Sequence, residues 1–233
     1  DTDRGRIRVR VEAAVRAGEN VRRRAADVAA GTTVLPQGAR VSARHVAVLA
    51  GIGRSRVNVR PAPRVVIIPV GDELVEPGQS RDPGDVFDAN GHAMASAVAD
   101  AGGRAFRVAA VPDEPSALAE TVEDQLVRAD VLITTGGLSI GRGDAVEDVL
   151  TPLGPVRFDA VAMTPGRRLG VGTVESTPIF CLPGDPVSAQ IAFETFVRPA
   201  VRQIAGRREL HRSCLPASIS TGWHSPPEKR EFV

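Results

Sequence analysis

The chain is poor in aromatic residues and has no excess of charge of one sign. Of its 233 residues only 3% are aromatic, with seven Phe, one Trp and no Tyr. Proteins that bind single-stranded nucleic acid stack bases on aromatic side chains, so this composition argues against that class. The 29 basic and 28 acidic residues give a net charge of +1. A near balance of this kind provides no field suited to DNA or to a membrane surface, and we expect neither partner.

Cysteine and long apolar runs are scarce as well. Cys181 and Cys214 form no CxxC or other metal-type spacing. They could pair, but free buried thiols in a reducing cytoplasm are the favoured interpretation. No run of about 18 apolar residues is long enough to span a bilayer, and no signal peptide opens the chain. We therefore predict a cytoplasmic protein. Because the chain starts at Asp1 and both ends resemble the middle of a strand, we expect a piece of something longer.

The sequence divides into three segments with different patterns. Residues 1–60 combine short apolar stretches with turn residues and predict a β-rich N-terminal segment, a partial domain, with one short helix capped by Ser42. Residues 61–206 alternate apolar strands with amphipathic helices. Residues 207–233 predict the truncated start of a C-terminal β domain.

The middle segment, residues 61–206, predicts an α/β fold with three layers. Residues 64–70 are nearly all apolar, which is typical of a parallel strand buried on both faces. Strands alternating with amphipathic helices build a sheet with helices packed against it. We expect further strands at 106–111, 131–133 and 179–182, and helices capped by Asn90, beginning at Pro115, spanning 144–150 and spanning 187–205.

A glycine-rich stretch after the third predicted strand, TGGLSIGRGD at residues 135–144, has two interpretations. Its letters Gly-Leu-Ser-Ile-Gly match a nucleophile elbow, and Ser139, Asp185 and either His211 or His224 would then form a triad. An elbow needs a sharp turn exactly at the serine, whereas glycines on both sides of Ser139 predict a wide loop. The favoured interpretation is a phosphate-binding loop at the carboxyl end of a parallel strand, with Ser139 as a hydrogen-bond donor.

Acidic residues follow other strand ends. Glu73 comes after the first strand, Asp88 precedes the first helix of the middle segment, and Asp144 follows the glycine loop. Carboxylates at adjacent strand ends, beside a phosphate loop, are how a hard divalent cation is usually held next to a phosphorylated ligand. For Asp88 and Asp144 helix capping is the alternative.

Together these motifs resemble the molybdopterin molybdenumtransferases, a family that includes the bacterial molybdenum insertases and the C-terminal domain of gephyrin. The resemblance lies in Gly71-Asp72-Glu73-Leu74, in Asp88-Ala89-Asn90, in Thr134-Thr135-Gly136-Gly137-Leu138-Ser139-Ile140-Gly141 with Asp144, and in Leu182-Pro183-Gly184-Asp185-Pro186-Val187-Ser188. The stretch from Gly18 to Arg24, with Asp27, is similar to the family's segment just upstream.

The resemblance implies a molybdopterin-binding α/β domain and a reaction. Such enzymes insert molybdate into adenylylated molybdopterin and release AMP with the help of Mg²⁺, and they are typically homodimers. Glu73, Asp88 and Asp144 would be the catalytic residues and metal ligands. The implied residues for substrate and phosphate binding are Gly136, Gly137, Ser139, Gly141, Thr164, Arg167, Pro183, Asp185, Pro186 and Ser188.

The chain departs from the family pattern at cationic positions. Thr164-Pro165-Gly166-Arg167 stands where the family usually has Lys-Pro-Gly-Lys, and Ala160 and Asp185 replace Lys and Asn. We interpret Arg167 as the one cation left in this motif, which predicts weaker oxyanion binding. The departures leave an alternative open, a relative that binds molybdopterin or scaffolds partners without catalysing insertion.

Overall fold

The computed structural model describes residues 13–138, 144–218, 220–225 and 227–233. It divides the chain into two units, residues 1–58 and residues 59–233, and each is described here by itself. The division lies next to the expected boundary at residues 60 and 61.

The first unit contains helix α1 (Ala43–Gly51), and the predicted cap at Ser42 is present. The backbone N–H of Ser42 donates to Nδ1 of His45 at 3.1 Å. Over residues 13–58 the described chain forms no strand and buries no residue, so the short strands expected in this range are not found. A strand is stable only in a sheet with a covered apolar face, and apolar side chains such as Val21 and Ile52 remain exposed. The alternation at residues 7–11 lies outside the described residues.

The second unit is built on a six-stranded sheet with the order β4-β1-β5-β9-β8-β6. β4 (Arg104–Arg107), β1 (Arg64–Pro69), β5 (Val131–Thr135) and β9 (Thr177–Leu182) run parallel. β8 (Arg168–Val174) and β6 (Val156–Ala160) complete the sheet in antiparallel orientation. The apolar run of β1 lies inside the sheet, and Val65, Val66, Ile67 and Ile68 are fully buried.

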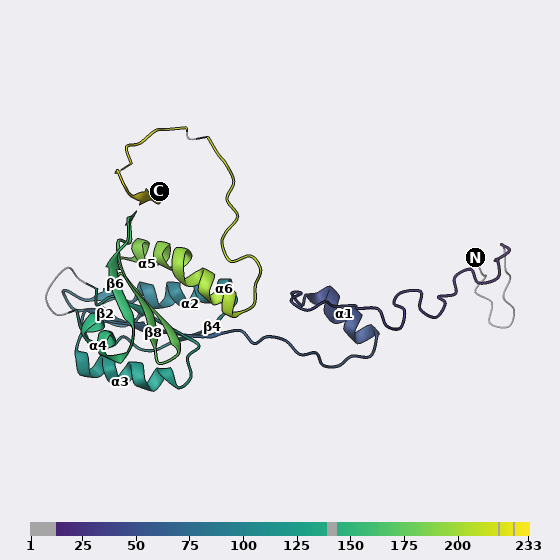
Figure 1. The fold of residues 1–233 in the computed structure, drawn as a ribbon, viewed down its shortest axis with the longest axis horizontal. Helices are drawn as coiled ribbons and strands as arrows, with labels where there is room; N and C mark the ends of the chain where they lie inside the picture. Colours follow the sequence, from purple (N-terminus) through teal and green to yellow (C-terminus); the bar gives the residue numbers. More distant parts are fainter. Residues whose placement is uncertain (1–12, 139–143, 219, 226) are drawn as a thin grey trace. The chain divides into compact units, whose positions relative to one another are not determined.

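Helices cover both faces of this sheet (Figure 1). One face packs Val65 and Ile67 against α2 (Ala89–Ala101), α5 (Pro186–Ala192), the π-helical turn η1 (Phe193–Val197) and α6 (Arg198–Ile204). The other face packs Val66 and Ile68 against α3 (Pro115–Leu126) and α4 (Ala145–Leu153). Two helical layers around a mainly parallel sheet confirm the predicted three-layer α/β domain.

Three predicted elements differ in detail. The second strand, expected at 106–111, ends at Arg107, and Val111 forms only an isolated bridge with Val70. Helix α2 is capped by Asp88 rather than Asn90, because the Asp88 carboxylate accepts the backbone N–H of Gly91. The long helix expected at 187–205 is interrupted by η1.

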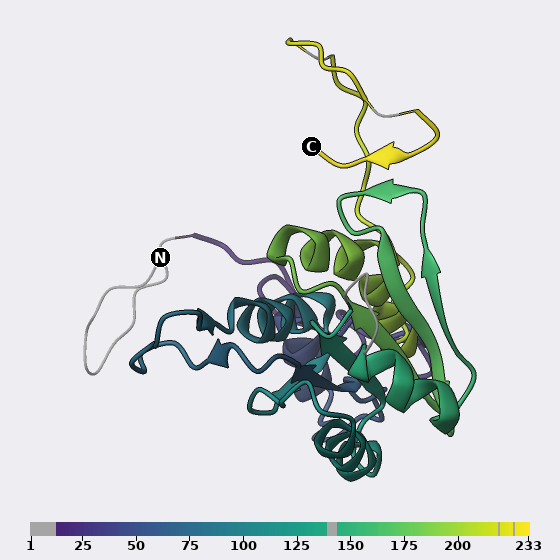
Figure 2. The ribbon, with the colours of Figure 1, turned by 90° about the vertical axis from the view of Figure 1, so that its left-hand side faces the viewer.

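Two small strand pairs extend from the sheet. β2 (Leu74–Val75) pairs with β3 (Val86–Phe87), and we call residues 72–88 the β2–β3 ribbon. β7 (Met163–Thr164) pairs with β10 (Arg230–Glu231), so the end of the chain returns to β7 within the second unit (Figure 2). A separate C-terminal β domain beginning at residue 207 stays a prediction.

Both cysteines are free thiols, as predicted, but only Cys181 is buried. Burial raises the pKa of the Cys181 thiol to about 12, whereas Cys214 is exposed, contrary to expectation. Among the residues that the structure describes, no helix combines the length and the apolar character needed to cross a bilayer.

Candidate functional site

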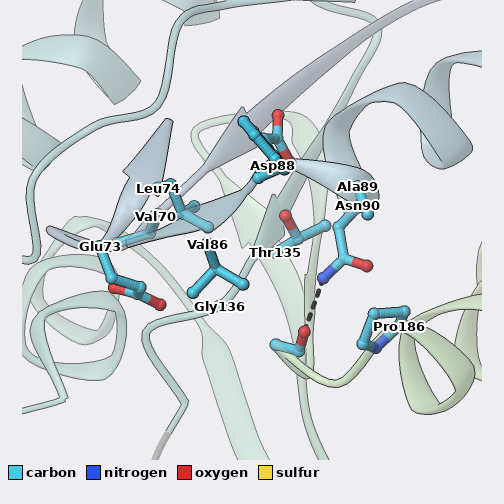
Figure 3. Close-up of a pocket in the computed structure, with 12 residues that line it drawn as sticks. Val70, Glu73, Leu74, Val86, Asp88, Ala89, Asn90, Thr135, Gly136 and Pro186 are labelled. Carbon is cyan, nitrogen blue, oxygen red and sulfur yellow. Dashed lines mark hydrogen bonds between the residues drawn. The ribbon is translucent and has the colours of Figure 1, made fainter. Parts of the chain in front are cut away.

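A pocket of about 140 Å³ opens where parallel strands β1, β5 and β9 end (Figure 3). Four segments that lie far apart in the sequence line it, namely the residues after β1, the ribbon with the start of α2, the end of β5, and the loop before α5. The carboxyl ends of parallel strands are where open α/β sheets bind ligands. Its lining residues are Val70, Glu73, Leu74, Val86, Phe87, Asp88, Ala89, Asn90, Thr135, Gly136, Gly184 and Pro186.

Gly136, at the start of the glycine loop, forms part of the pocket wall and is packed closely against the neighbouring backbone. Gly136 has a φ of +87°, and a Cβ at this position would lie 2.2 Å from the carbonyl oxygen of Val70. Gly137 has a φ of +64°, and its Cβ would lie 2.6 Å from a methyl group of Val146. Only glycine fits both positions without a shift of the surrounding chain. Ser139 and Gly141, the other predicted residues of this loop, lie outside the described residues.

The loop before α5 lies directly beside Gly136, because a Cβ on Gly184 would lie 3.5 Å from the Cα of Gly136. The Asn90 amide donates to the carbonyl of Gly184 at 2.8 Å, which joins the start of α2 to this loop. Pro186 lines the pocket, and Pro183 is half-buried. Asp185 is exposed and caps α5, because its carboxylate accepts the backbone N–H of Ser188 at 2.8 Å. Hydrogen bonds from Ser188 lower the pKa of Asp185.

The Thr-Pro-Gly-Arg turn lies against the start of α5. A Cβ on Gly166, whose φ is +91°, would lie 3.1 Å from the carbonyl oxygen of the buried Ser188. Thr164 is half-buried at the end of β7, and Arg167 is exposed. The structure therefore brings this motif beside the loop at residues 183–188.

The three predicted carboxylates are not gathered at one point. Glu73 lines the pocket. Asp88 is buried, accepts the N–H of Gly91 at 2.7 Å and pairs with Arg107 at 3.1 Å. Asp144 is buried at the start of α4 and pairs with Arg168 at 2.7 Å. In the described part of the chain no group of three His, Cys, Asp or Glu side chains is arranged to hold a metal ion.

Helix capping, the alternative role for Asp88 and Asp144, is confirmed for Asp88 but not for Asp144. Asp88 caps α2 through its side chain, as that alternative expected. Asp144 occupies the N-cap position of α4 without a side-chain cap hydrogen bond, and its carboxylate contacts Arg168 instead. Arg168 also pairs with Glu147 at 2.5 Å. Arg168, the residue directly after the Thr-Pro-Gly-Arg motif, is thus a further arginine at this place, and it contacts a predicted site residue.

Asp113 is a candidate that the sequence reasoning missed. It follows the Val111 bridge at the same edge of the sheet, and its backbone N–H donates to the Asp72 carboxylate at 3.0 Å. Burial, and then the charges of Asp72, Asp144 and Glu73, raise the pKa of Asp113. Asp113 thus lies among carboxylates of the site, whereas Asp88 is held by an arginine. An acidic residue after a predicted strand was the available signal, but residues 112–115 were interpreted only as a helix start.

Comparison with known proteins identifies the family of the chain. A family model described as "Probable molybdopterin binding domain" matches residues 66–203, which include the glycine loop and the loop before α5. A second, described as "MoeA N-terminal region (domain I and II)", matches residues 1–53. The chain belongs to the molybdopterin molybdenumtransferase family. The serine-hydrolase alternative is not favoured by this membership.

Curated relatives carry the family name. Molybdopterin molybdenumtransferase 2 of Mycobacterium tuberculosis is 37% identical over 237 residues, which cover 99% of this chain and 58% of the relative. Molybdopterin molybdenumtransferase 1 of the same organism is 40% identical over 218 residues, covering 93% of this chain and 51% of the relative. The chain thus spans between half and three fifths of these transferases.

Solved structures are similar to this chain in fold. The molybdopterin biosynthesis MoeA protein from Pyrococcus horikoshii superposes with a TM-score of 0.71 at 29% identity, covering 79% of this chain and 46% of that protein. A molybdopterin biosynthesis protein from Mycobacterium abscessus superposes with a TM-score of 0.51 at 21% identity, covering 62% of this chain and 95% of that protein. The second likeness concerns the fold alone.

Proposed function

We propose that the protein containing this chain inserts molybdate into adenylylated molybdopterin and releases AMP. The observation that carries the proposal is the pocket, because it joins four motif-bearing segments at the carboxyl ends of β1, β5 and β9. The relatives named molybdopterin molybdenumtransferases support the reaction class. The family membership and these relatives do not favour the alternative, a relative that binds molybdopterin without catalysing insertion.

In this proposal the glycine loop binds the phosphate part of the substrate. Gly136 lines the pocket, and glycine at positions 136 and 137 places no side chain between the main chain and a bound anion. Ser139 and Gly141 would complete the loop. A second wall of the substrate site, next to the glycine loop, would be formed by Thr164, Arg167, Pro183, Asp185, Pro186 and Ser188. In this wall the Asp185 carboxylate accepts the backbone N–H of Ser188 and so caps the start of α5.

We also propose that the site uses Mg²⁺. Carboxylate oxygens are the ligands that this cation prefers, and Asp113 lies near the charges of Asp72, Asp144 and Glu73, which a cation would help to neutralise. Glu73 and Asp113 would each supply a carboxylate oxygen, and water and substrate phosphates would complete the coordination of the ion. The contacts of Asp88 with Arg107 and Gly91 favour a structural role for Asp88. When bound, the cation would neutralise phosphate charge beside the glycine loop.

A homodimer and a cytoplasmic location complete the proposal. Both follow from the resemblance to the transferase family, in which active sites draw on two chains. Sedimentation equilibrium of the full-length protein tests the first. A mass that corresponds to one chain at micromolar concentration would contradict it.

The reaction is tested by molybdate-dependent release of AMP from adenylylated molybdopterin by the full-length protein. We expect Glu73→Gln to lower the rate by about two orders of magnitude, since positioned charges commonly contribute that much to catalysis. Asp124→Asn, which removes an exposed carboxylate on α3, is the control and should retain the rate. A rate of AMP release that does not depend on molybdate, or equal rates in Glu73→Gln and Asp124→Asn, would contradict the proposal.

A further inference from the structure

One arginine ties the β2–β3 ribbon to the body of the α/β domain. Arg107 lies at the end of the edge strand β4, outside the pocket lining. Its Nη1 lies 2.5 Å from Oε1 of Glu76, which follows β2, and 3.1 Å from Oδ2 of Asp88, which follows β3. The same guanidinium nitrogen therefore contacts both strands of the ribbon. Nε2 of His92, on α2, lies 3.3 Å from the other oxygen of Glu76.

Burial makes this contact more than a surface ion pair. The side chain of Asp88 is 2% exposed and that of Arg107 is 21% exposed, whereas Glu76 is 34% exposed. A buried carboxylate that loses its cation is strongly destabilised, so Asp88 requires Arg107. The hydrogen bond between Arg107 and Glu76 raises the pKa of the guanidinium and lowers the pKa of the carboxyl.

Gly91 provides an independent sign that the chain accommodates this contact. It lies in the first turn of α2, where glycine is less favourable than alanine by about 1 kcal/mol. A Cβ at Gly91 would lie 2.2 Å from Oδ2 of Asp88 and 2.8 Å from Cδ of Arg107. Glycine at this position leaves room for the buried pair.

The ribbon in turn carries part of the pocket wall. Glu73, Leu74 and Val86 belong to it and line the pocket (Figure 3). Two backbone hydrogen bonds join its strands, from the N–H of Val86 to Glu73 at 2.7 Å and from the N–H of Asp88 to Val75 at 2.9 Å. So short a pair is marginal by itself and needs further contacts to hold its place.

We propose that Arg107 is a positioning residue: by bridging Glu76 and Asp88 it holds the ribbon against β4 and α2 and so fixes Glu73 at the pocket. This role rests on the proposed function of the pocket. Arg107 acts through the ribbon and does not contact the substrate. Glu76 is the residue of the bridge that can be substituted for a test, because its removal leaves the buried ion pair of Asp88 and Arg107 intact.

The test compares Glu76→Gln with Asp82→Asn, an acid-to-amide change at an exposed position of the same ribbon, in the full-length protein. Amide hydrogen exchange followed by NMR reports on the ribbon without any substrate. We expect the amides of Val86 and Asp88 to exchange about tenfold faster in Glu76→Gln, since a hydrogen bond to a charged group contributes at least one factor of ten to a local equilibrium. Asp82→Asn and the amides of β1 should be unchanged.

Steady-state kinetics then test whether the bridge from Arg107 to Glu76 and Asp88 holds Glu73 in position at the pocket. For AMP release we expect kcat/KM to fall about tenfold in Glu76→Gln while the thermal midpoint stays within about 2 °C, which is the shift that roughly 0.5–1 kcal/mol produces in a domain of this size. Arg107→Lys, which keeps the charge, should retain more of kcat/KM than Arg107→Gln.

The outcomes separate this inference from the proposed function. Unchanged exchange at Val86 and Asp88 would overturn the bridge, and faster exchange with unchanged kcat/KM would overturn its positioning role. If the wild-type protein releases no AMP in the presence of molybdate, the proposed function fails, and exchange alone then decides whether Arg107 holds the ribbon.

Discussion

Replacing Gly136 by alanine probes the backbone packing that forms the pocket wall. The residue has a φ of +87°, and a Cβ would lie 2.2 Å from the carbonyl oxygen of Val70. That carbonyl cannot easily move, because the N–H of Val70 donates to Thr135 at 2.8 Å and the N–H of Gly71 donates to Val111 at 3.0 Å. We therefore expect Gly136→Ala to destabilise the α/β domain.

Two effects set the magnitude. An L-residue in the left-handed region costs about 1–2 kcal/mol, and forcing an atom into a packed site costs about 1–3 kcal/mol more. Alanine also restricts the unfolded chain, which returns about 0.4–1 kcal/mol. We expect a net loss of about 3 kcal/mol, equivalent to a fall of roughly 6–12 °C in Tm for a domain of this size.

Gly78 provides the matched control. Its φ of +93° is similar, but nothing lies within 4 Å of a Cβ at this position. Gly78→Ala should therefore cost only about 1 kcal/mol, from the backbone conformation alone. Urea unfolding of both variants, followed by circular dichroism at 222 nm, measures the difference. If the two losses agree within about 0.5 kcal/mol, the contact with Val70 does not require glycine and the described packing of the loop is refuted.

Two further predictions use the pH dependence of single carboxyl groups. Because the pKa of Asp113 is raised in the folded state, the charge of Asp113 reduces stability as the pH rises through that pKa. Asp113→Asn should therefore raise the free energy of unfolding by about 0.5 kcal/mol at pH 7, a small value because the side chain is exposed. Near pH 3 the substitution should not change stability. Asp113→Asn should also lower the rate of AMP release. Because the pKa of Asp185 is lowered in the folded state, the stabilisation by this charged cap is present at neutral pH and is lost as the pH falls through that pKa. Asp185→Ala should lower the free energy of unfolding by about 1 kcal/mol at pH 7, and Asp185→Asn should lower it much less. A larger AMP signal in Asp113→Asn, or equal stability of the two Asp185 variants, would contradict these expectations.

The sequence predicted the α/β domain well because its signals are local. A continuous apolar run made β1 recognisable as a buried parallel strand, and Gly102, with a φ of +95°, ends α2 in the expected left-handed conformation. The strands expected in residues 13–58 failed for the opposite reason. Alternating apolar residues show that a strand is locally allowed, but a strand also needs a neighbour, and local sequence does not reveal whether one exists.

The site was predictable where function depends on position along a strand. Glu73, Asn90, Gly136 and Pro186 follow strand ends or begin helices, and the topology of a parallel sheet brings such positions together. The partners of the carboxylates were not predictable in this way. Arg107 reaches Asp88 from another strand, and no pattern near Asp88 shows that contact.

The arginines divide the acidic residues of this edge into two kinds. Asp88 and Asp144 each face a guanidinium, so their charges are already balanced within the fold. In the described part of the chain neither Glu73 nor Asp113 takes part in an ion pair. Burial, and then the charges of neighbouring carboxylates, raise the pKa of Asp113. A cation gains most where negative charge is not yet balanced. Substitutions at Glu73 and Asp113 should therefore weaken the binding of a cation. Substitutions at Asp88 should mainly lower the stability of the fold around the pocket.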